Sequence, residues 1–286
     1  MDHVYIIQDI NLIAQLQNKT VVVETDNSEK IEEIYNIVRE HNQLYCIKLN
    51  VNQDISSISF KEEWKNIPLV IYRVSGSSTT LTNHVSGGRC GDLGWVRDLV
   101  SMLPILKKLN VKCFLDGAVA QNYEAVQILS SLGIYSGIVI NENANWEKLT
   151  DLIYYALCNR VQHAPIEPFQ YVYDAYKQHT LVDYGTVFFE NQERFIYVDN
   201  FFTAKCAKET QSTQNINTLN PYLLKVPLVA DCNKPWQRFF YEGSVCAACE
   251  GWRICMGKYA DMEDKNSCRD FTVELLNVVE NRKFKN

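Results

Sequence analysis

The chain has 286 residues, of which 47% are apolar and 22% charged, and its formal net charge is −6. This composition is typical of a globular protein, and the length favours two domains or one large domain. The acidic balance and the lack of a dense Lys/Arg cluster disfavour nucleic acid and anionic membranes as partners. Met1–Val4 lack the basic and apolar segments of a signal peptide, and no stretch approaches the roughly 18 apolar residues of a membrane span. We therefore expect a cytoplasmic protein without a membrane partner.

The first 160 residues alternate strand-like and helix-like segments. The predicted strands are short, apolar and rich in Val and Ile, as buried parallel strands are. They are Val4–Ile7, Thr20–Glu24, Leu44–Leu49, Leu69–Val74, Lys112–Asp116 and Ser136–Asn141. Helices with one apolar face are predicted between them, at Ser28–Glu40, Asn122–Leu132 and Glu147–Cys158. Repeated βα units imply a parallel sheet, and periodicity leaves open an open or partial barrel or a doubly wound sheet.

The pattern changes near His163–Pro168, where two prolines within four residues indicate a linker. We therefore place one domain at residues 1–163 and a second at residues 164–286. A short helix is predicted at Phe169–His179, and Thr186–Phe189 and Arg194–Val198 are interpreted as a hairpin. Such a hairpin would offer a strand edge for pairing with an extended peptide.

Cysteine is concentrated near the C-terminus, where five of the ten cysteines lie between Cys232 and Cys268. In a reducing compartment, clustered cysteines more often bind metal than form disulfides. A Cys-x2-Cys pair can place two sulfurs on one metal or cluster. A third cysteine follows after five residues and a fourth after a longer loop, and each could supply a further ligand. We predict one metal site on Cys246, Cys249, Cys255 and Cys268. Four thiolates suit Zn²⁺ or an iron–sulfur cluster, and the spacing alone does not choose between them.

Other features near this motif have two interpretations. A closing helix is predicted after Cys268, with an apolar side formed by Phe271, Leu275, Val278 and Val279. An aromatic cluster either shields the metal site or docks a partner. Its members are Trp236, Phe239, Phe240, Tyr241 and Trp252.

Three weaker features lie in the first half. The glycine-rich stretch Ser86–Gly94 before a predicted helix is either a ligand-binding loop or an ordinary βα connection, and its role stays open. Asp116 ends a strand and is either a functional residue or a turn acid. Cys46 and Cys113 lie inside apolar strands and are expected to pack as small core residues.

The motif Cys-x2-Cys-x5-Cys, with Gly257 two residues on and a later cysteine, resembles the SPASM domain. That domain follows the partial (β/α)6 barrel in many radical S-adenosylmethionine (radical-SAM) enzymes that modify peptides. The resemblance implies an α/β fold, with a partial (β/α)6 barrel-like N-terminal domain and a C-terminal cysteine-rich SPASM-like domain. It also implies that the four predicted cysteines bind one auxiliary [4Fe–4S] cluster, with zinc as the alternative.

The family's second cluster site is incomplete in this chain. Tyr259 stands at one of its cysteine positions, and Phe201 stands at the glycine of its upstream motif. Cys206 alone fits an upstream ligand, at the end of a predicted hairpin over Arg194–Cys206, and the role of Cys232 stays open. We therefore expect this second site to be lost.

The Cys-x3-Cys-x2-Cys motif that radical-SAM enzymes carry after the first strand is absent. In the first 200 residues, no two cysteines are closer than Cys90 and Cys113. We therefore expect no S-adenosylmethionine cleavage by the usual route and no radical-SAM enzyme activity. As a whole, the chain is similar to pseudo-radical-SAM/SPASM proteins associated with peptide natural-product maturation.

That similarity implies a non-catalytic accessory protein. It would carry one [4Fe–4S] cluster and bind a precursor peptide or an active peptide-modifying radical-SAM enzyme. Two alternatives remain: a redox enzyme or electron carrier that uses the single cluster, and a zinc-stabilised binding protein.

Overall fold

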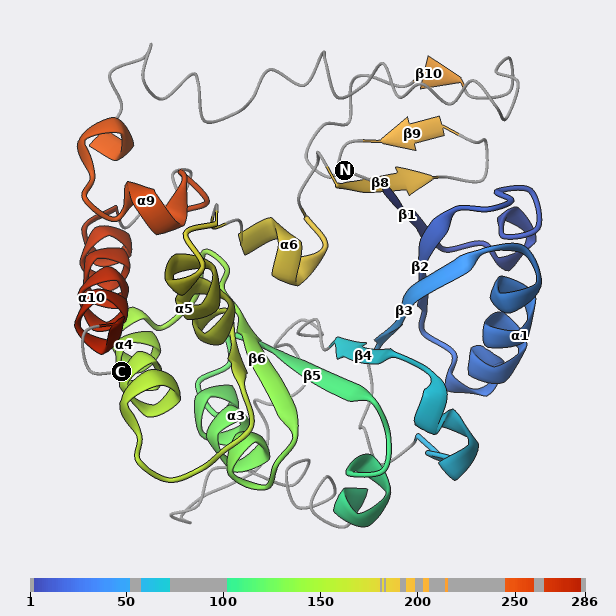
Figure 1. Cartoon of the computed structure of the whole chain (residues 1–286), viewed down its shortest axis with the longest axis horizontal. Helices are drawn as coiled ribbons and strands as arrows, with labels where there is room; N and C mark the ends of the chain where they lie inside the picture. The colour runs from blue at the N-terminus through green and yellow to red at the C-terminus, as the bar shows by residue number, and fades with distance from the viewer. Residues whose placement is uncertain are drawn as a thin grey trace, which may run out of the picture.

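One large, mostly parallel sheet organises the molecule (Figure 1). The computed structural model describes residues 3–51, 58–72, 102–180, 182, 184–190, 194–198, 203–205, 214–215, 245–259 and 265–283. Within these residues, ten strands pair in the order β10-β9-β8-β1-β2-β3-β4-β5-β6-β7. The strands are β1 Val4–Ile7, β2 Thr20–Thr25, β3 Gln43–Asn50, β4 Leu69–Tyr72, β5 Val111–Asp116, β6 Tyr135–Val139, β7 Ile166–Glu167, β8 Phe195–Val198, β9 Thr203–Lys205 and β10 Gln214–Asn215.

Helices connect the strands and complete the C-terminal part. The α-helices are α1 Ile31–His41, α3 Asn122–Ser131, α4 Trp146–Cys158, α5 Phe169–Lys177, α6 Tyr184–Phe188, α9 Trp252–Cys255 and α10 Lys265–Lys283. The short 3-10 helices are η1 Ile10–Leu12, η2 Ser28–Lys30, η4 Glu62–Asn66 and η8 Val245–Ala248. Among the described residues, no helix combines the length and apolar character needed to cross a bilayer.

The order of the strands confirms the α/β class and excludes a doubly wound sheet for the described part. Strands β1 to β7 follow one another in chain order, and all are parallel. A doubly wound sheet would instead reverse its order at a switch point. The six strands and three helices predicted in the first half are confirmed where described, with ends shifted by at most two residues except at Ser28–Glu40, where the 3-10 helix η2 precedes α1 and α1 begins at Ile31.

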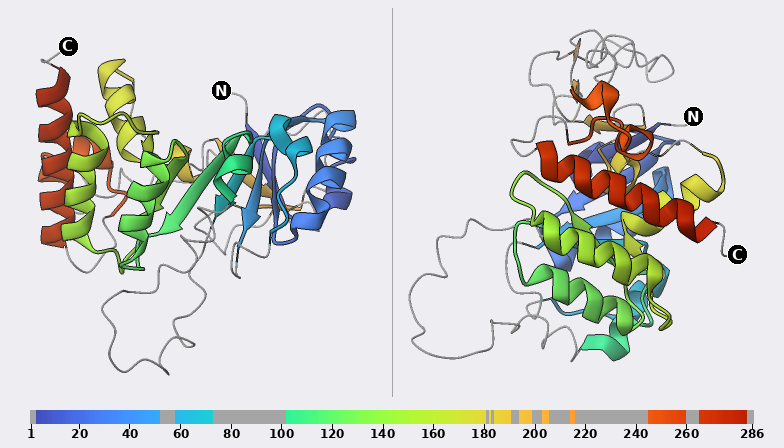
Figure 2. Two further views of the ribbon diagram at one scale, coloured as in Figure 1. Left: turned by 90° about the horizontal axis from the view of Figure 1, so that it is seen from below. Right: turned by 90° about the vertical axis from the view of Figure 1, so that its left-hand side faces the viewer.

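The two faces of the sheet have different cores because side chains alternate along each strand. Tyr5 and Ile7 point to the larger core, which α1, α3 and α4 cover, whereas Val4 and Ile6 point to a smaller one. The smaller core includes Phe188 at the end of α6, which therefore lies against the opposite face. Figure 2 shows α3, α4 and α10 side by side in front of the strands.

The predicted hairpin at Thr186–Phe189 is wrong, because Tyr184–Phe188 form helix α6. A short apolar run is compatible with either a buried strand or a buried helix, and here the helix places Phe188 in the smaller core against the sheet. Strand β8 within Arg194–Val198 pairs in parallel with β1 and antiparallel with β9. Tyr197 and Val198 are therefore paired on both edges, and the β8–β9 pairing confirms a hairpin within Arg194–Cys206.

The region His163–Pro168 is also more ordered than a linker. Ile166–Glu167 form β7, whose residues pair with Ser136 and Gly137 of β6. Strands β7 and β8 thus extend the sheet beyond residue 163, and α10 packs on α4 and α5. The proposed division at residue 163 stays a prediction. The Ser86–Gly94 loop lies outside the described residues.

Candidate metal centre

The four predicted ligands come from neighbouring short elements of the C-terminal part. Cys246 lies in η8, Cys249 follows it, and Cys255 is the last residue of α9. Cys268 lies in the first turn of α10. The Cys249 N–H donates to the Cys246 carbonyl oxygen at 3.2 Å, so the Cys-x2-Cys segment turns back on itself. Figure 1 shows α9 above α10 at one side of the molecule.

Cys255 and Cys268 are in direct contact. The Cys268 thiol donates a hydrogen bond to the Cys255 sulfur, and this bond is the main cause that lowers the pKa of Cys255 to about 7, against the effect of burial. The backbone N–H groups of Tyr259, Gly257 and Lys258 also lower the pKa of this thiol, and the Lys258 N–H donates to the Cys255 carbonyl oxygen at 2.9 Å. Gly257 has a φ of 78°, a left-handed conformation that favours glycine. The turn after α9 is therefore shaped to surround one sulfur with donors.

Cys246 and Cys249 lie near this pair without completing a metal site. Their charges help to raise the pKa of Cys268, after the hydrogen bond to Cys255 and burial. No group of three or more His, Cys, Asp or Glu side chains is arranged to hold a metal ion in the part of the chain that the structure describes. The structure thus brings Cys255 and Cys268 into contact and places Cys246 and Cys249 nearby.

Two buried tyrosines beside the thiols were missed as site residues by the sequence reasoning. The rings of Tyr184 and Tyr259 are 5.8 Å apart between centroids, and neither hydroxyl has a hydrogen-bond partner within the described parts of the chain. Burial and the charges of Cys255 and Cys268 raise the pKa of both hydroxyls. An unsatisfied buried hydroxyl costs about 1–3 kcal/mol. Tyr184 carries no sequence signal for this role, because α6 and the cysteine motif meet only in the folded chain.

Cysteine sulfur is a donor type that suits a thiolate-bound metal or cluster, although the described residues do not bring three or more such donors together around one position. Four sulfurs can act as ligands, and backbone N–H groups already point to one of them. Ligating sulfurs accept hydrogen bonds from their surroundings, and two unpartnered hydroxyls are available for this purpose.

The aromatic surroundings differ from the predicted cluster. Trp146 contacts Tyr259 and Phe271 with centroids 5.8 and 5.6 Å away. Trp252 is half-buried, whereas the other predicted cluster members lie outside the described residues. Aromatic residues of α4, α6 and α10 therefore pack around the Tyr259 ring.

Gly251 has no side chain, and this lets α9 lie close to α10. A Cβ atom there would lie 2.3 Å from Thr272 Oγ1 and 2.7 Å from Thr272 Cβ. Thr272 Oγ1 in turn donates to the Cys268 carbonyl oxygen at 3.0 Å, one turn away on α10. This close approach holds Cys255 next to Cys268.

Gly251→Ala is therefore expected to separate the cysteine pair. The added methyl group must displace Thr272, and such overpacking costs about 1–3 kcal/mol. Urea unfolding should show this loss, and metal analysis should show reduced occupancy. The control is Gly133→Ala: its φ of 86° brings strain of about 1–2 kcal/mol, but its Cβ meets only Lys107 Cε, at 4.0 Å. Equal metal occupancy in the two variants would contradict the prediction.

The weaker sequence features now have structural explanations. Asp116 is a turn acid: its Oδ1 accepts the Ala118 N–H at 2.8 Å and the Asn141 amide at 2.6 Å. Cys46 and Cys113 are confirmed as core residues, and burial raises the pKa of each thiol to about 12. These groups are structural.

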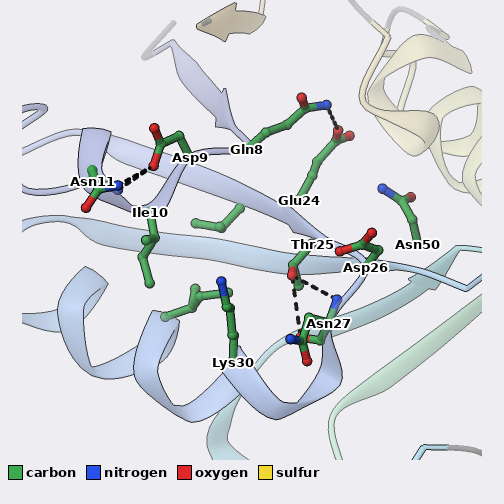
Figure 3. Close-up of a pocket in the computed structure, with 12 residues that line it drawn as sticks. Gln8, Asp9, Ile10, Asn11, Glu24, Thr25, Asp26, Asn27, Lys30 and Asn50 are labelled. Atoms are coloured by element: carbon green, nitrogen blue, oxygen red, sulfur yellow. Dashed lines mark hydrogen bonds between the residues drawn. The ribbon is translucent and has the colours of Figure 1, made fainter. Parts of the chain in front are cut away.

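A second candidate site is a polar cavity at the C-terminal ends of β1, β2 and β3 (Figure 3). It has a volume of about 600 Å³. Gln8 Nε2 donates to Glu24 at 3.0 Å on its wall, and Asp26 and Lys30 are exposed at its rim. None of the twelve residues drawn in Figure 3 as lining it is a cysteine. Sequence reasoning missed this cavity because its walls come from separate segments.

The sheet also holds a buried ion pair beneath this cavity. Lys48 Nζ lies 2.8 Å from Glu24 Oε1, and both side chains are at most 10% exposed. The same ammonium group lies 4.2 Å from the centre of the Tyr72 ring. One wall of the cavity is thus fixed by a charge pair.

Comparison of the chain with family models, with curated proteins and with solved structures found no match. The resemblance to the SPASM domain therefore depends on the residues of this chain. The structural observations that bear on it are the Cys255–Cys268 contact, its N–H donors and the two buried hydroxyls.

Proposed function

We propose that this protein is a non-catalytic radical-SAM-like accessory protein that carries one auxiliary [4Fe–4S] cluster and binds a precursor peptide or a peptide-modifying enzyme. The observation that carries the proposal is the Cys255–Cys268 pair, in which the Cys268 thiol and the backbone N–H groups after α9 lower the pKa of Cys255. Cys246 and Cys249 supply the other two ligands. When bound, such a cluster supplies one-electron transfer and cross-links its four ligands.

The chain's own residues hold this site against the sheet. Cys268 lies in the first turn of α10, where its thiol is next to Cys255. Phe271 of the same helix contacts Phe169 of α5, with centroids 6.4 Å apart. Tyr176 of α5 donates to Glu280 of α10 at 2.7 Å. Metal binding by Cys268 would therefore stabilise the docking of α10.

The sheet supports the barrel part of the proposal. Sequential parallel strands, with α1, α3 and α4 covering one face, are the arrangement of a singly wound sheet, as in β/α barrels. The C-terminal strand ends, where such folds bind ligands, carry carboxylate, amide and ammonium groups at the 600 Å³ cavity. Among the described residues that line this cavity, none is a cysteine. We propose that the cavity instead receives a polar segment of the partner.

The test combines an assay for S-adenosylmethionine cleavage with an assay for binding of a peptide or enzyme. Anaerobically purified protein with dithionite and S-adenosylmethionine should form no 5′-deoxyadenosine, and it should capture a precursor peptide or modifying enzyme encoded nearby. Asp26→Lys reverses an exposed charge at the cavity rim and should weaken this capture. Glu142→Lys makes the same change at an exposed acid that does not line the cavity, and capture should persist.

Two outcomes would contradict the proposal. Turnover to 5′-deoxyadenosine by the purified chain would overturn the non-catalytic assignment. Failure to capture any peptide or enzyme would overturn the accessory role and favour an electron carrier.

A further inference from the structure

A further cavity, with a volume of about 450 Å³, lies on the face of the sheet opposite to α1, α3 and α4. Phe114 and Phe189 of the smaller core line it. Leu69, Lys112 and Tyr135 also line it, and each is the first or second residue of its strand. The cavity therefore lies at the N-terminal strand ends, whereas the cavity of Figure 3 lies at the C-terminal ends.

A buried carboxylate, that of Glu167, forms part of the wall. This residue is only 6% exposed. The Tyr135 hydroxyl donates to Glu167 Oε1, and the Tyr171 N–H donates to Oε2 at 3.0 Å. Both donors are neutral, and Glu167 forms no ion pair with any other described residue. Burial raises the pKa of this carboxyl, which reflects the cost of a charge removed from water. A cationic group in the cavity would offset that cost.

An ammonium group lies near the same tyrosine. Lys112 is exposed, and its Nζ lies 4.4 Å from the centre of the Tyr135 ring. Lys112 and Phe114 are two residues apart on β5, so their side chains point to the same face of the sheet. Within the described part of the chain, Lys112 forms no ion pair. One anionic and one cationic group thus contact Tyr135, the first through its hydroxyl and the second over its ring.

The rest of the wall is largely apolar and aromatic. The rings of Tyr45 and Phe189 are 6.2 Å apart between centroids, and both residues line the cavity. Gly137 is opposite Glu167 in the β6–β7 register. A Cβ atom at Gly137 would lie 2.6 Å from the Phe114 ring and 3.1 Å from Glu167 Cβ, so the glycine lets both side chains lie against β6. Apolar walls with a few convergent polar groups are typical of sites for small molecules.

We propose that this cavity binds a free α-amino acid with an apolar side chain. Its ammonium group contacts Glu167, its carboxylate contacts Lys112, and its side chain packs against the aromatic wall. Each Glu167 oxygen accepts one hydrogen bond in the structure and has a second lone pair for the ligand. A simple cation would be repelled by Lys112 and a simple anion by Glu167, so the pair selects a ligand that carries both charges. This site requires neither the metal nor the partner protein.

The first part of the test is calorimetric titration of the full chain with L-phenylalanine and with L-leucine. Two compounds each lack one charge of L-phenylalanine: 3-phenylpropionate has no ammonium group and 2-phenylethylamine has no carboxylate. L-phenylalanine should bind at least about tenfold more tightly than 3-phenylpropionate, because the ammonium contacts a buried carboxylate. It should bind at least about threefold more tightly than 2-phenylethylamine, a smaller effect because Lys112 is exposed.

The second part uses variants of the two charged residues. Glu167→Gln should weaken binding of L-phenylalanine at least about tenfold, and Lys112→Met at least about threefold. The control is Lys177→Met, since Lys177 is also exposed and its Nζ lies 5.9 Å from the centre of the Tyr173 ring, but it does not line the cavity. Its affinity should equal that of the wild type. Thermal melts show whether each variant is folded, and the ligand series tests the ammonium contact even where Glu167→Gln is not.

Three outcomes would overturn the inference. The first is no heat of binding with either amino acid at millimolar concentration. The second is equal affinity for L-phenylalanine and for the two compounds that lack one charge. The third is an effect of Lys112→Met no larger than that of Lys177→Met. None of these outcomes bears on the proposed cluster or on capture of a partner, so the two proposals are tested separately.

Discussion

Serine in place of Cys268 is expected to abolish metal binding by this protein. Anaerobically prepared wild-type protein should contain about four irons per chain and show a thiolate-to-iron absorption band. Cys268→Ser and Cys249→Ser should reduce the iron to less than about one per chain, because a cluster held by four thiolates loses much of its affinity with each one. Iron and sulfide analysis gives the result directly.

The stability of the C-terminal helix should follow the metal. Cys268 lies on α10, which packs on α4 and α5, so loss of the metal should loosen this packing. Added iron should raise the melting temperature of the wild-type protein and leave that of Cys268→Ser unchanged. Protease digestion should release α10 more readily from the variant.

Other cysteines provide controls for this loss. Cys158 is exposed at the end of α4, and Cys158→Ser should keep the metal. Cys206→Ser and Cys232→Ser should also keep it. Stoichiometric zinc without sulfide would contradict the cluster and retain the four ligands. Loss of metal in Cys232→Ser alone would show that the fourth ligand is misassigned.

A second large effect is expected from Lys48→Met. The substitution keeps most of the length of the side chain but leaves the Glu24 carboxylate buried without its ammonium partner, and among the described residues the Gln8 amide remains as a donor. Breaking a buried ion pair by removing one partner costs about 3–5 kcal/mol. The free energy of unfolding, measured with urea, should fall by this amount.

Two further variants show whether burial of the ion pair causes the loss of stability in Lys48→Met. Lys61→Met removes an ion pair with Glu32 in which both side chains are more than 40% exposed, and its effect should be far smaller. Adding Glu24→Leu to Lys48→Met removes the stranded charge and should recover much of the lost stability. A Lys48→Met effect no larger than that of Lys61→Met would contradict the prediction.

Local sequence patterns predicted the first half of the fold well. Apolar runs such as Thr20–Glu24 and Leu44–Leu49 must be buried, and the helices between them have one apolar face; both signals are contained in neighbouring residues. The same reasoning failed at Thr186–Phe189. Its apolar residues are buried against the sheet, and only the available space beside β1 to β5 decides that they form a helix.

The cysteine spacing predicted four ligands, and the fold brings two of them, Cys255 and Cys268, together. Cys255 and Cys268 lie next to each other because Gly251 allows α9 to contact α10. A sequence pattern does not predict this contact between separate segments. The strand order, the cavity above β1 to β3 and the position of Tyr184 beside the thiols also depend on distant segments. Short-range patterns encode the elements and the candidate ligand types. Contacts between distant side chains, and the burial of their polar groups, arise only after the elements have packed together.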